Sequence, residues 1–481
     1  MQKASFNWFA VILLFAASSA VGAVRYVNVN NGVPASPYTS WSTAATSIQN
    51  AIDAAAPGDT VLVADGVYQT GGYPVSGVNN GTGKSGNEPN RVAVTKPITV
   101  VSVNGPLQTV IMGSIGDPAS AMPVRCVFLT NGARLDGFTL TNGLVDYFAD
   151  NSGDVGGGGV WCASTNSIVN NCIIAGNSSG VSGGGAFSGT LNCCTLSLNY
   201  AIFGAGAAES VLNNCLLIRN IASGGGGVGG GAFDCLLNGC TIVNNLASGS
   251  SGGVSGCTSS NCIVFNNIAG FSGNNYDNQS VYPSLFNYCC TTPLPADGLG
   301  NITNKPLFVD LTSGDFHLQN NSPCINAGMN AWVTSTNDLD GNPRIVGGTV
   351  DMGAYEFQTP GSILSYAWAQ PFGFPTDGSA DFADADGDGL SNFAEWRAGT
   401  NPTNALSVLQ LTSPVISNNP ARVIITWQSV TNVTYYLQRS SSLTTAFSGI
   451  QSNLLGQPGT TSYIDYPNPN GQSFFYRIGV Q

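Results

Sequence analysis

Short apolar stretches of three to five residues alternate with glycine-rich turns through the middle of this chain, at a nearly constant spacing. Five of these stretches follow aligned cysteines, Cys172, Cys194, Cys215, Cys240 and Cys262, which are 22, 21, 25 and 22 residues apart. Helical repeats need longer apolar-periodic segments and tolerate little glycine. Short strands joined by tight turns fit the pattern, so the spacing predicts a parallel β-helix with one coil per repeat.

A second residue type repeats with the cysteines. An asparagine follows each of them after five residues, at Asn177, Asn199, Asn220, Asn245 and Asn267. Equivalent residues of successive coils stack about 4.8 Å apart, the spacing of neighbouring strands. We therefore expect the cysteines to form a buried file of mostly reduced thiols, since in-register parallel neighbours meet disulfide geometry poorly. Pairing of Cys235 with Cys257 stays open.

The N-terminal part predicts an export signal followed by a capping helix. Residues 1–23 combine Lys3, the apolar run Phe9–Phe15 and a small-residue cleavage site, as in a secretory signal peptide. Thr46–Ala55 then reads as one short amphipathic helix, with Thr46 and Gln49 in a capping-box pattern. Such a helix is expected to cover the open end of the solenoid. No later segment is long and apolar enough to span a bilayer, so none is expected in the mature chain.

Two stretches carry a resemblance to a known superfamily. Ile48–Tyr68 (I-Q-N-A-I-D-A-A-A-P-G-D-T-V-L-V-A-D-G-V-Y) resembles the opening of right-handed parallel β-helix proteins of the pectate-lyase-like superfamily. Ser322–Gly328 and Asp338–Glu356 resemble the closing segment of secreted bacterial β-helix proteins of the choice-of-anchor type. The resemblance implies an all-β, right-handed solenoid over residues 24–357. It leaves the chemistry open, because this superfamily includes lyases, hydrolases, epimerases and non-catalytic adhesins.

A composition break follows Phe357. Prolines and glycines mark residues 358–405 as a linker. Residues 406–481 contain alternating Tyr/Phe/Ile-rich strands, which predict a small antiparallel β-sandwich similar to fibronectin type III modules. The predicted strands are Arg422–Trp427, Tyr435–Arg439, Ser462–Tyr466 and Phe474–Val480.

The most specific local motif lies in the linker. D-A-D-G-D-G-L-S-N-F-A-E, residues 384–395, matches the twelve-residue calcium loop at every ligand position. We expect a structural Ca²⁺ site that stiffens the junction between solenoid and sandwich. The loop resembles the single calcium loops of dockerin-like and thrombospondin type 3 repeats. Its expected ligands are Asp384, Asp386, Asp388, the Leu390 carbonyl, Asn392 and Glu395.

A second set of acidic residues falls on the coils. Aligning the glycine-rich turns places Glu209 and Asp234 on adjacent coils, with Arg219 ten residues after Glu209. Paired carboxylates share a proton or bind a cation, and they carry glycoside hydrolysis. These three residues are therefore the catalytic candidates, against the alternative that both acids are ordinary surface residues.

A further group, Asp338, Asp340, Arg344, Asp351 and Glu356, is expected to form a hydrogen-bonded end cap.

The amino-acid composition argues against several classes of partner and metal. The 481 residues are 43% hydrophobic and only 8% charged, with a formal net charge of −12, which disfavours nucleic acid and anionic lipid as partners. One histidine, His317, and the lack of a Cys-x-x-Cys motif argue against zinc. We expect a secreted or cell-surface monomer that binds an extended polysaccharide or a surface partner. The alternatives are a polysaccharide lyase or glycoside hydrolase, and a structural spacer or adhesin.

Overall fold

The computed structural model describes residues 22–75, 89–114, 123–145, 156–278, 281–418, 421–467 and 473–481. The predicted signal peptide, apart from its last two residues, lies outside the described residues. Within them, no helix combines the length and apolar character needed to cross a membrane.

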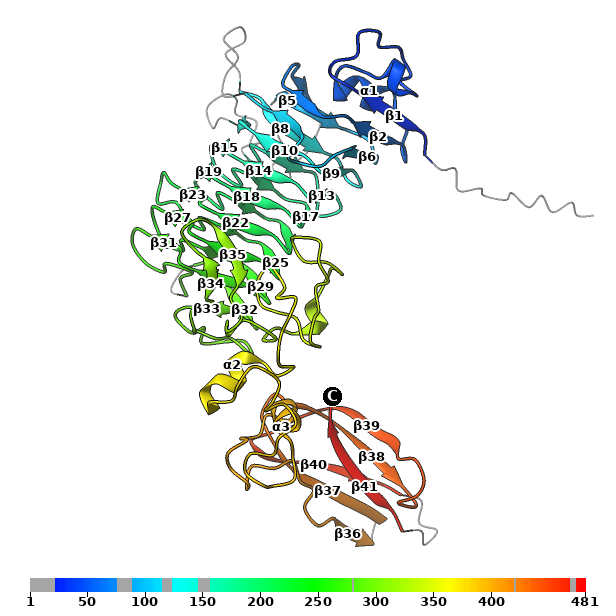
Figure 1. Ribbon diagram of the computed structural model, residues 1–481, viewed down its shortest axis with the longest axis vertical. Helices are drawn as coiled ribbons and strands as arrows, with labels where there is room; N and C mark the ends of the chain where they lie inside the picture. Colours follow the sequence, from blue (N-terminus) through cyan, green and yellow to red (C-terminus); the bar gives the residue numbers. More distant parts are fainter. Residues whose placement is uncertain are drawn as a thin grey trace, which may run out of the picture.

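The central part of the chain is the predicted parallel β-helix, built from four sheets that run along its axis (Figure 1). We name the sheets in the order in which a coil passes through them. The first sheet consists of β1 (Val24–Val27), β2 (Thr60–Val63), β6 (Thr99–Ser102), β9 (Arg134–Asp136), β13 (Ile168–Asn170), β17 (Thr190–Asn192), β21 (Val211–Asn213), β25 (Leu236–Asn238), β29 (Thr258–Ser260) and β32 (Leu285–Asn287). The second sheet consists of β3 (Gly66–Tyr68), β7 (Thr109–Met112), β10 (Thr139–Thr141), β14 (Ile173–Ala175), β18 (Thr195–Ser197), β22 (Leu216–Ile218), β26 (Thr241–Val243), β30 (Ile263–Phe265) and β33 (Cys290–Thr291).

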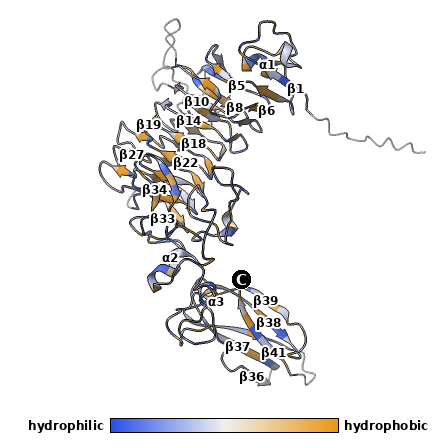
Figure 2. Ribbon diagram, viewed as in Figure 1, coloured by the Kyte–Doolittle hydropathy of each residue, from blue (hydrophilic) through white to orange (hydrophobic). Residues whose placement is uncertain are grey.

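The other two sheets complete each coil. The third sheet consists of β11 (Leu144–Val145), β15 (Ser178–Ser179), β19 (Tyr200–Ala201), β23 (Ile221–Ala222), β27 (Leu246–Ala247) and β31 (Ile268–Ala269). The fourth sheet consists of β4 (Tyr73–Pro74), β5 (Pro89–Val94), β8 (Arg125–Leu129), β12 (Val160–Cys162), β16 (Ala186–Phe187), β20 (Ala207–Ala208), β24 (Ala232–Phe233) and β28 (Val254–Ser255). All pairs are parallel except β4 with β5. Figure 2 shows hydrophobic residues recurring in successive strands.

The cysteines form the predicted single file inside the solenoid. The backbone N–H of Cys194 lies 3.4 Å from Cys215 Sγ, and that of Cys240 lies 3.3 Å from Cys262 Sγ. All thirteen thiols, including those of Cys235 and Cys257, are free, and only Cys193 is not fully buried. Burial raises the pKa of Cys126 and Cys162 to about 12. Thiols in this state are protonated and unreactive, which suits a purely structural role.

The asparagines form a parallel file of buried amides. The Asn199 backbone N–H and side-chain NH₂ both donate to Asn220 Oδ1, at 3.1 and 3.0 Å. Asn220 donates in the same way to Asn245 Oδ1, at 2.9 Å for both bonds, and also to the Leu196 carbonyl at 2.9 Å. Each amide therefore satisfies the polar backbone of a turn that no water reaches.

Replacing one member of this file should destabilise the solenoid. Asn220→Ala leaves the Asn199 backbone N–H buried without its acceptor and removes one bond from the Leu196 carbonyl, at a cost of about 1–3 kcal/mol for the unsatisfied group. We expect a clear fall in the urea midpoint of unfolding. Asn166→Ala, on an exposed turn, is the matched control and should change the midpoint little. An equal midpoint for both variants would contradict this role.

Helix α1 (Ile48–Ala54) covers the N-terminal end as predicted, but its cap differs. Ser47, not Thr46, is the N-cap, and its hydroxyl accepts from the Asn50 N–H. Gln49 instead reaches β5, where it accepts from the Ala93 N–H at 2.9 Å and donates to the Ala93 carbonyl at 3.1 Å. The predicted capping box is therefore wrong, because the helix begins one residue later. The Gln49 amide instead makes the two hydrogen bonds to Ala93 that a neighbouring strand would make.

The closing segment lies along the side of the solenoid rather than over its end. The hairpin of β34 (Phe308–Asp310) and β35 (Asp315–Leu318) and the residues after it pack on the outer face of the second sheet. In the later coils this face is apolar at Leu216, Val243 and Ile263, which need cover. The Arg344 cluster that was predicted as an end cap is indeed hydrogen-bonded, but it anchors this side segment. Short helices follow in and after it: η2 (Asn330–Trp332), α2 (Tyr366–Ala369) and η3 (Gln370–Phe372); η1 (Trp41–Thr43) lies near the N-terminus.

The C-terminal stretch forms two three-stranded antiparallel sheets that share one core. One sheet has the order β36 (Val415–Asn418), β37 (Ala421–Ser429), β40 (Gly459–Asp465), and the other β39 (Ser448–Leu455), β38 (Thr434–Ser440), β41 (Phe475–Val480). Ile425 and Trp427 of one sheet pack against Tyr435 and Leu437 of the other. Four of these strands match predicted ones, whereas β36 and β39 were not predicted. The likeness to fibronectin type III modules stays a prediction.

Candidate functional site

The predicted calcium loop gathers its carboxylates at one point. Carboxylate oxygens of Asp384, Asp386 and Asp388 all lie within 4.8 Å of one another. Gly387 and Gly389 have φ angles of 80° and 96°, which let the chain turn tightly between these residues. Both Asp384 oxygens accept backbone N–H groups, from Gly387 at 2.7 Å and Gly389 at 2.9 Å.

Helix α3 (Asn392–Ala398) contains the other two predicted side-chain ligands. Ser391 caps this helix by accepting from the Ala394 N–H. The Asn392 NH₂ donates to the Ala380 carbonyl at 2.8 Å, which fixes the amide and leaves its Oδ1 without a donor. Glu395 is fully buried and accepts from the Thr400 hydroxyl at 3.3 Å through Oε1 only.

Four buried oxygens of this loop have no hydrogen-bond partner, and all four belong to predicted ligands: Asp386 Oδ2, Asp388 Oδ2, Asn392 Oδ1 and Glu395 Oε2. Burial, with the nearby Asp386, Asp388 and Asp384 carboxylates, raises the pKa of Glu395 to about 7. Orphaned buried oxygens and crowded like charges are both costly. A hard divalent cation relieves both, so the donor set fits Ca²⁺, with the Leu390 carbonyl as the backbone ligand.

The loop is attached to both of its neighbours. On the solenoid side, Asp381 accepts from the Ser362 hydroxyl at 2.5 Å and from the Ile363 N–H at 3.0 Å. On the sandwich side, the Arg397 guanidinium donates to the Gln481 carbonyl at 3.2 Å. The predicted ligands therefore lie in the segment that connects the solenoid to the sandwich.

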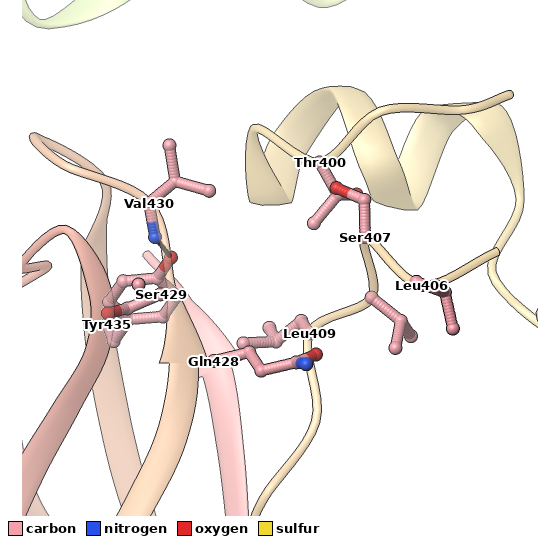
Figure 3. A pocket seen from close by; sticks show the side chains of 10 residues that line it. Thr400, Leu406, Ser407, Leu409, Gln428, Ser429, Val430 and Tyr435 are labelled. Atoms are coloured by element: carbon pink, nitrogen blue, oxygen red, sulfur yellow. Dashed lines mark hydrogen bonds between the residues drawn. The ribbon is translucent and has the colours of Figure 1, made fainter. Parts of the chain in front are cut away.

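A cleft of about 200 Å³ separates the end of this segment from the sandwich (Figure 3). Thr400 and Ser407 line one side, and Gln428, Ser429 and Tyr435 line the other. Thr400, which bonds to Glu395, thus connects the calcium loop to the wall of the cleft.

On the solenoid, the structure brings two of the three catalytic candidates together. Glu209 and Asp234 follow directly after the aligned pair Ala208 and Phe233, so they occupy one column at the corner after the fourth sheet. The Glu209 N–H donates to the Phe233 carbonyl at 3.0 Å. Burial, with Asp234 as the second cause, raises the pKa of Glu209.

Arg219 lies elsewhere on the coil. It follows β22, at the corner between the second and third sheets, so the first and second sheets separate it from Glu209 along the chain. The two corners are opposite each other in the four-sided coil. The structure therefore supports an acidic pair without this basic partner.

A row of aromatic side chains beside the acidic pair escaped the sequence-based prediction. In the fourth sheet, Val160, Ala186, Ala207, Ala232 and Val254 face the core, so the next residue of each strand faces outward. Phe187 and Phe233 occupy such positions. Phe203, from the turn before β20, lies 5.4 Å from Phe233 between ring centroids, and Tyr282 lies 5.1 Å from it. We call Phe187, Phe203, Phe233 and Tyr282 the aromatic row.

The aromatic row is accessible and continuous with the acids. Its three phenylalanines are half-buried, and Tyr282 is 48% exposed. Glu209 and Asp234 are exposed at the adjoining corner. The repeated G-G-G-A-F at Gly183–Phe187 and Gly229–Phe233 was the available sequence signal for this row.

His317, the single histidine, lies in β35 between two carboxylates. Its Nδ1 is 2.6 Å from Asp315 and its Nε2 is 2.6 Å from Asp340. Burial lowers the pKa of His317, but the bonds to Asp340 and Asp315 outweigh that effect and raise it. The His317 ring therefore links β35 to the later part of the closing segment at Asp340. It lies away from the aromatic row.

No protein-family model and no curated protein matches this chain. Among solved structures, it is similar to the pectate lyase Pel9A (16% identity, TM-score 0.43, covering 70% of this chain and 97% of that one). It is also similar to a rhamnogalacturonan lyase (13%, 0.30, 56% and 68%) and to the rice weevil pectin methyl esterase (12%, 0.22, 58% and 72%). Such distant likenesses transfer no activity, and the β-helix assignment stands on the four sheets described above.

Proposed function

We propose that this chain is an exported β-helix protein that binds an extended glycan along the fourth sheet. The observation that carries the proposal is the aromatic row, in which Phe187, Phe203 and Phe233 lie on three successive coils and Tyr282 lies two coils after Phe233. Aromatic faces carry partial negative charge and attract the C–H edges of a stacked ring. Rings spaced along one side of a rigid solenoid suit a polymer that lies along the axis.

Calcium completes the proposal as a structural ion. Asp384, Asp386, Asp388, Leu390, Asn392 and Glu395 would hold it at the junction. There it would supply positive charge to oxygens that otherwise have no partner. Its role is to fix the segment between Asp381 and Thr400, and so to hold the sandwich against the solenoid.

Catalysis is the second candidate, and the adjacent Glu209 and Asp234 are the observation that favours it. Two carboxylates on neighbouring coils match the residue types that hydrolyse glycosidic bonds. Arg219 lies at a different corner, which removes the base that lyase chemistry would require there. Binding without turnover therefore fits the site better than lysis.

The proposal predicts retardation in native gels that contain a soluble polysaccharide, without release of reducing ends or unsaturated products. Phe233→Ala should weaken binding by about five-fold, since one stacked ring contributes on the order of 1 kcal/mol. Tyr282→Ala tests the same row at an exposed position. Leu246→Ala, on the exposed third sheet, is the matched control and should bind as wild type does.

Three outcomes separate the candidates. Turnover that Glu209→Gln abolishes would establish the enzyme instead of the binder. Neither retardation nor turnover across the panel would leave only a spacer or adhesin. Equal binding by wild type, Phe233→Ala and Tyr282→Ala would show that glycan binds elsewhere.

A further inference from the structure

The charges around the aromatic row point to the class of glycan, and this inference rests on the proposed function. Glu209 and Asp234 are exposed at the corner that adjoins the row. Their places on adjacent coils are set by backbone bonds from Glu209 to Phe233 and from Asp234 to Ser255, at 3.0 and 2.9 Å. Any polymer that stacks on Phe233 and Tyr282 therefore passes two carboxylates.

Basic residues are missing from the same region. Between Arg134 and Lys305, Arg219 is the only lysine or arginine in the sequence. It lies at the opposite corner of its coil, beyond two sheets. Binding of uronates or sulfated glycans depends on lysine or arginine beside the carboxylate or sulfate group. Arg91 and Arg125, in the first coils of the fourth sheet, are buried. Among the described residues, the aromatic row therefore offers a polyanion no exposed lysine or arginine, and its two acids add repulsion.

A neutral sugar polymer matches the same surface. Its rings present apolar C–H faces to Phe203, Phe233 and Tyr282, and its hydroxyl groups are donors. Carboxylates are strong acceptors, and a bond to a charged acceptor is roughly twice as strong as a neutral one. We infer that the aromatic row with Glu209 and Asp234 is a binding site for neutral, extended polysaccharide, and that it discriminates against polyuronates.

The test compares the intact protein on gels that contain hydroxyethylcellulose, glucomannan or polygalacturonate, each with calcium and with chelator. We expect retardation by at least one neutral polymer and none by polygalacturonate under either condition. Glu209→Lys should weaken neutral binding and create retardation by polygalacturonate. A basic residue is compatible with this corner, because Arg219 adopts φ 54° at its own corner and Glu209 has φ 53°.

Retardation by polygalacturonate that equals or exceeds that by the neutral polymers would overturn the inference and leave glycan binding in place. So would retardation by polygalacturonate that depends on calcium, because the ion would then bridge the acids to uronate. No retardation by any polymer would contradict the proposed function itself. Unfolding midpoints of the Glu209→Lys and wild-type proteins control for a folding defect, and Glu209→Gln should retain neutral binding better than Glu209→Lys does.

Discussion

Chelation of calcium is expected to lower the unfolding midpoint of the intact protein and to loosen its C-terminal third first. An ion that binds the folded loop and not the unfolded chain contributes to stability by mass action. At free calcium about 100 times the dissociation constant this contribution amounts to about 2.7 kcal/mol. Without the ion, Glu395 and its neighbours keep buried oxygens that lack partners. Scanning calorimetry with calcium and with excess chelator measures the difference.

Asp388→Ala should abolish this response, because it removes one of the three clustered carboxylates. The control is Asp377→Ala, an exposed acid just before the loop, whose response to chelator should equal that of wild type. Isothermal titration would give the stoichiometry, expected to be one ion per chain. An intact protein whose midpoint ignores both calcium and chelator would refute the site.

The clustering of Asp384, Asp386 and Asp388 could be predicted because these residues come from one short stretch with fixed spacing. The coils could be predicted for a related reason: each core position recurs once per repeat, so Cys172, Cys194 and Cys215 mark the same point of successive coils. In both cases local sequence order determines the geometry. The structure adds the orphaned oxygens of Asn392 and Glu395, which no pattern could reveal.

Residues whose neighbours come from elsewhere in the chain were harder to place. Leu216 and Val243 look like core residues, yet they face outward and are covered by the closing segment, which was expected at the end of the solenoid. Phe233 faces outward because it is the second residue of a two-residue strand whose first residue faces the core. The repeat period alone does not show which of the two residues faces outward. The separation of Arg219 from Glu209, by contrast, could have been predicted from the repeat, since ten residues in a coil of about 22 amount to nearly half a turn.

Removal of the Arg344 guanidinium should cause the largest loss of stability of any single substitution considered. Arg344 is 2% exposed, and its Nη1 lies 2.7 Å from Glu356 Oε2. The guanidinium also donates to Asn214 Oδ1 at 3.2 Å and to the Gly353 carbonyl at 2.6 Å, so it ties the closing segment to the solenoid. Breaking a buried pair by removing one partner typically costs about 3–5 kcal/mol. We expect Arg344→Met to lose about that much at pH 8.

The loss should shrink at pH 5. Burial and the nearby Asp351 raise the pKa of Glu356, while Arg344 lowers it, so the variant raises this pKa further. Between the ordinary pKa of a glutamate and this raised value, the folded state holds a proton that the unfolded state has released. Stability of the variant therefore falls as pH rises through that window. At pH 5 Glu356 is neutral and needs no cation, so urea midpoints at the two pH values should differ more for the variant than for wild type.

Two further variants make this prediction specific. Arg219→Met, at an exposed position, should change stability by less than about 0.5 kcal/mol. Combining Arg344→Met with Glu356→Gln removes the uncompensated charge, so the double variant should be more stable at pH 8 than Arg344→Met alone, with a coupling energy on the order of 1–3 kcal/mol. A loss below about 1 kcal/mol in Arg344→Met, or one that does not depend on pH, would mean that water or another donor compensates Glu356 and that packing alone holds the closing segment against the second sheet.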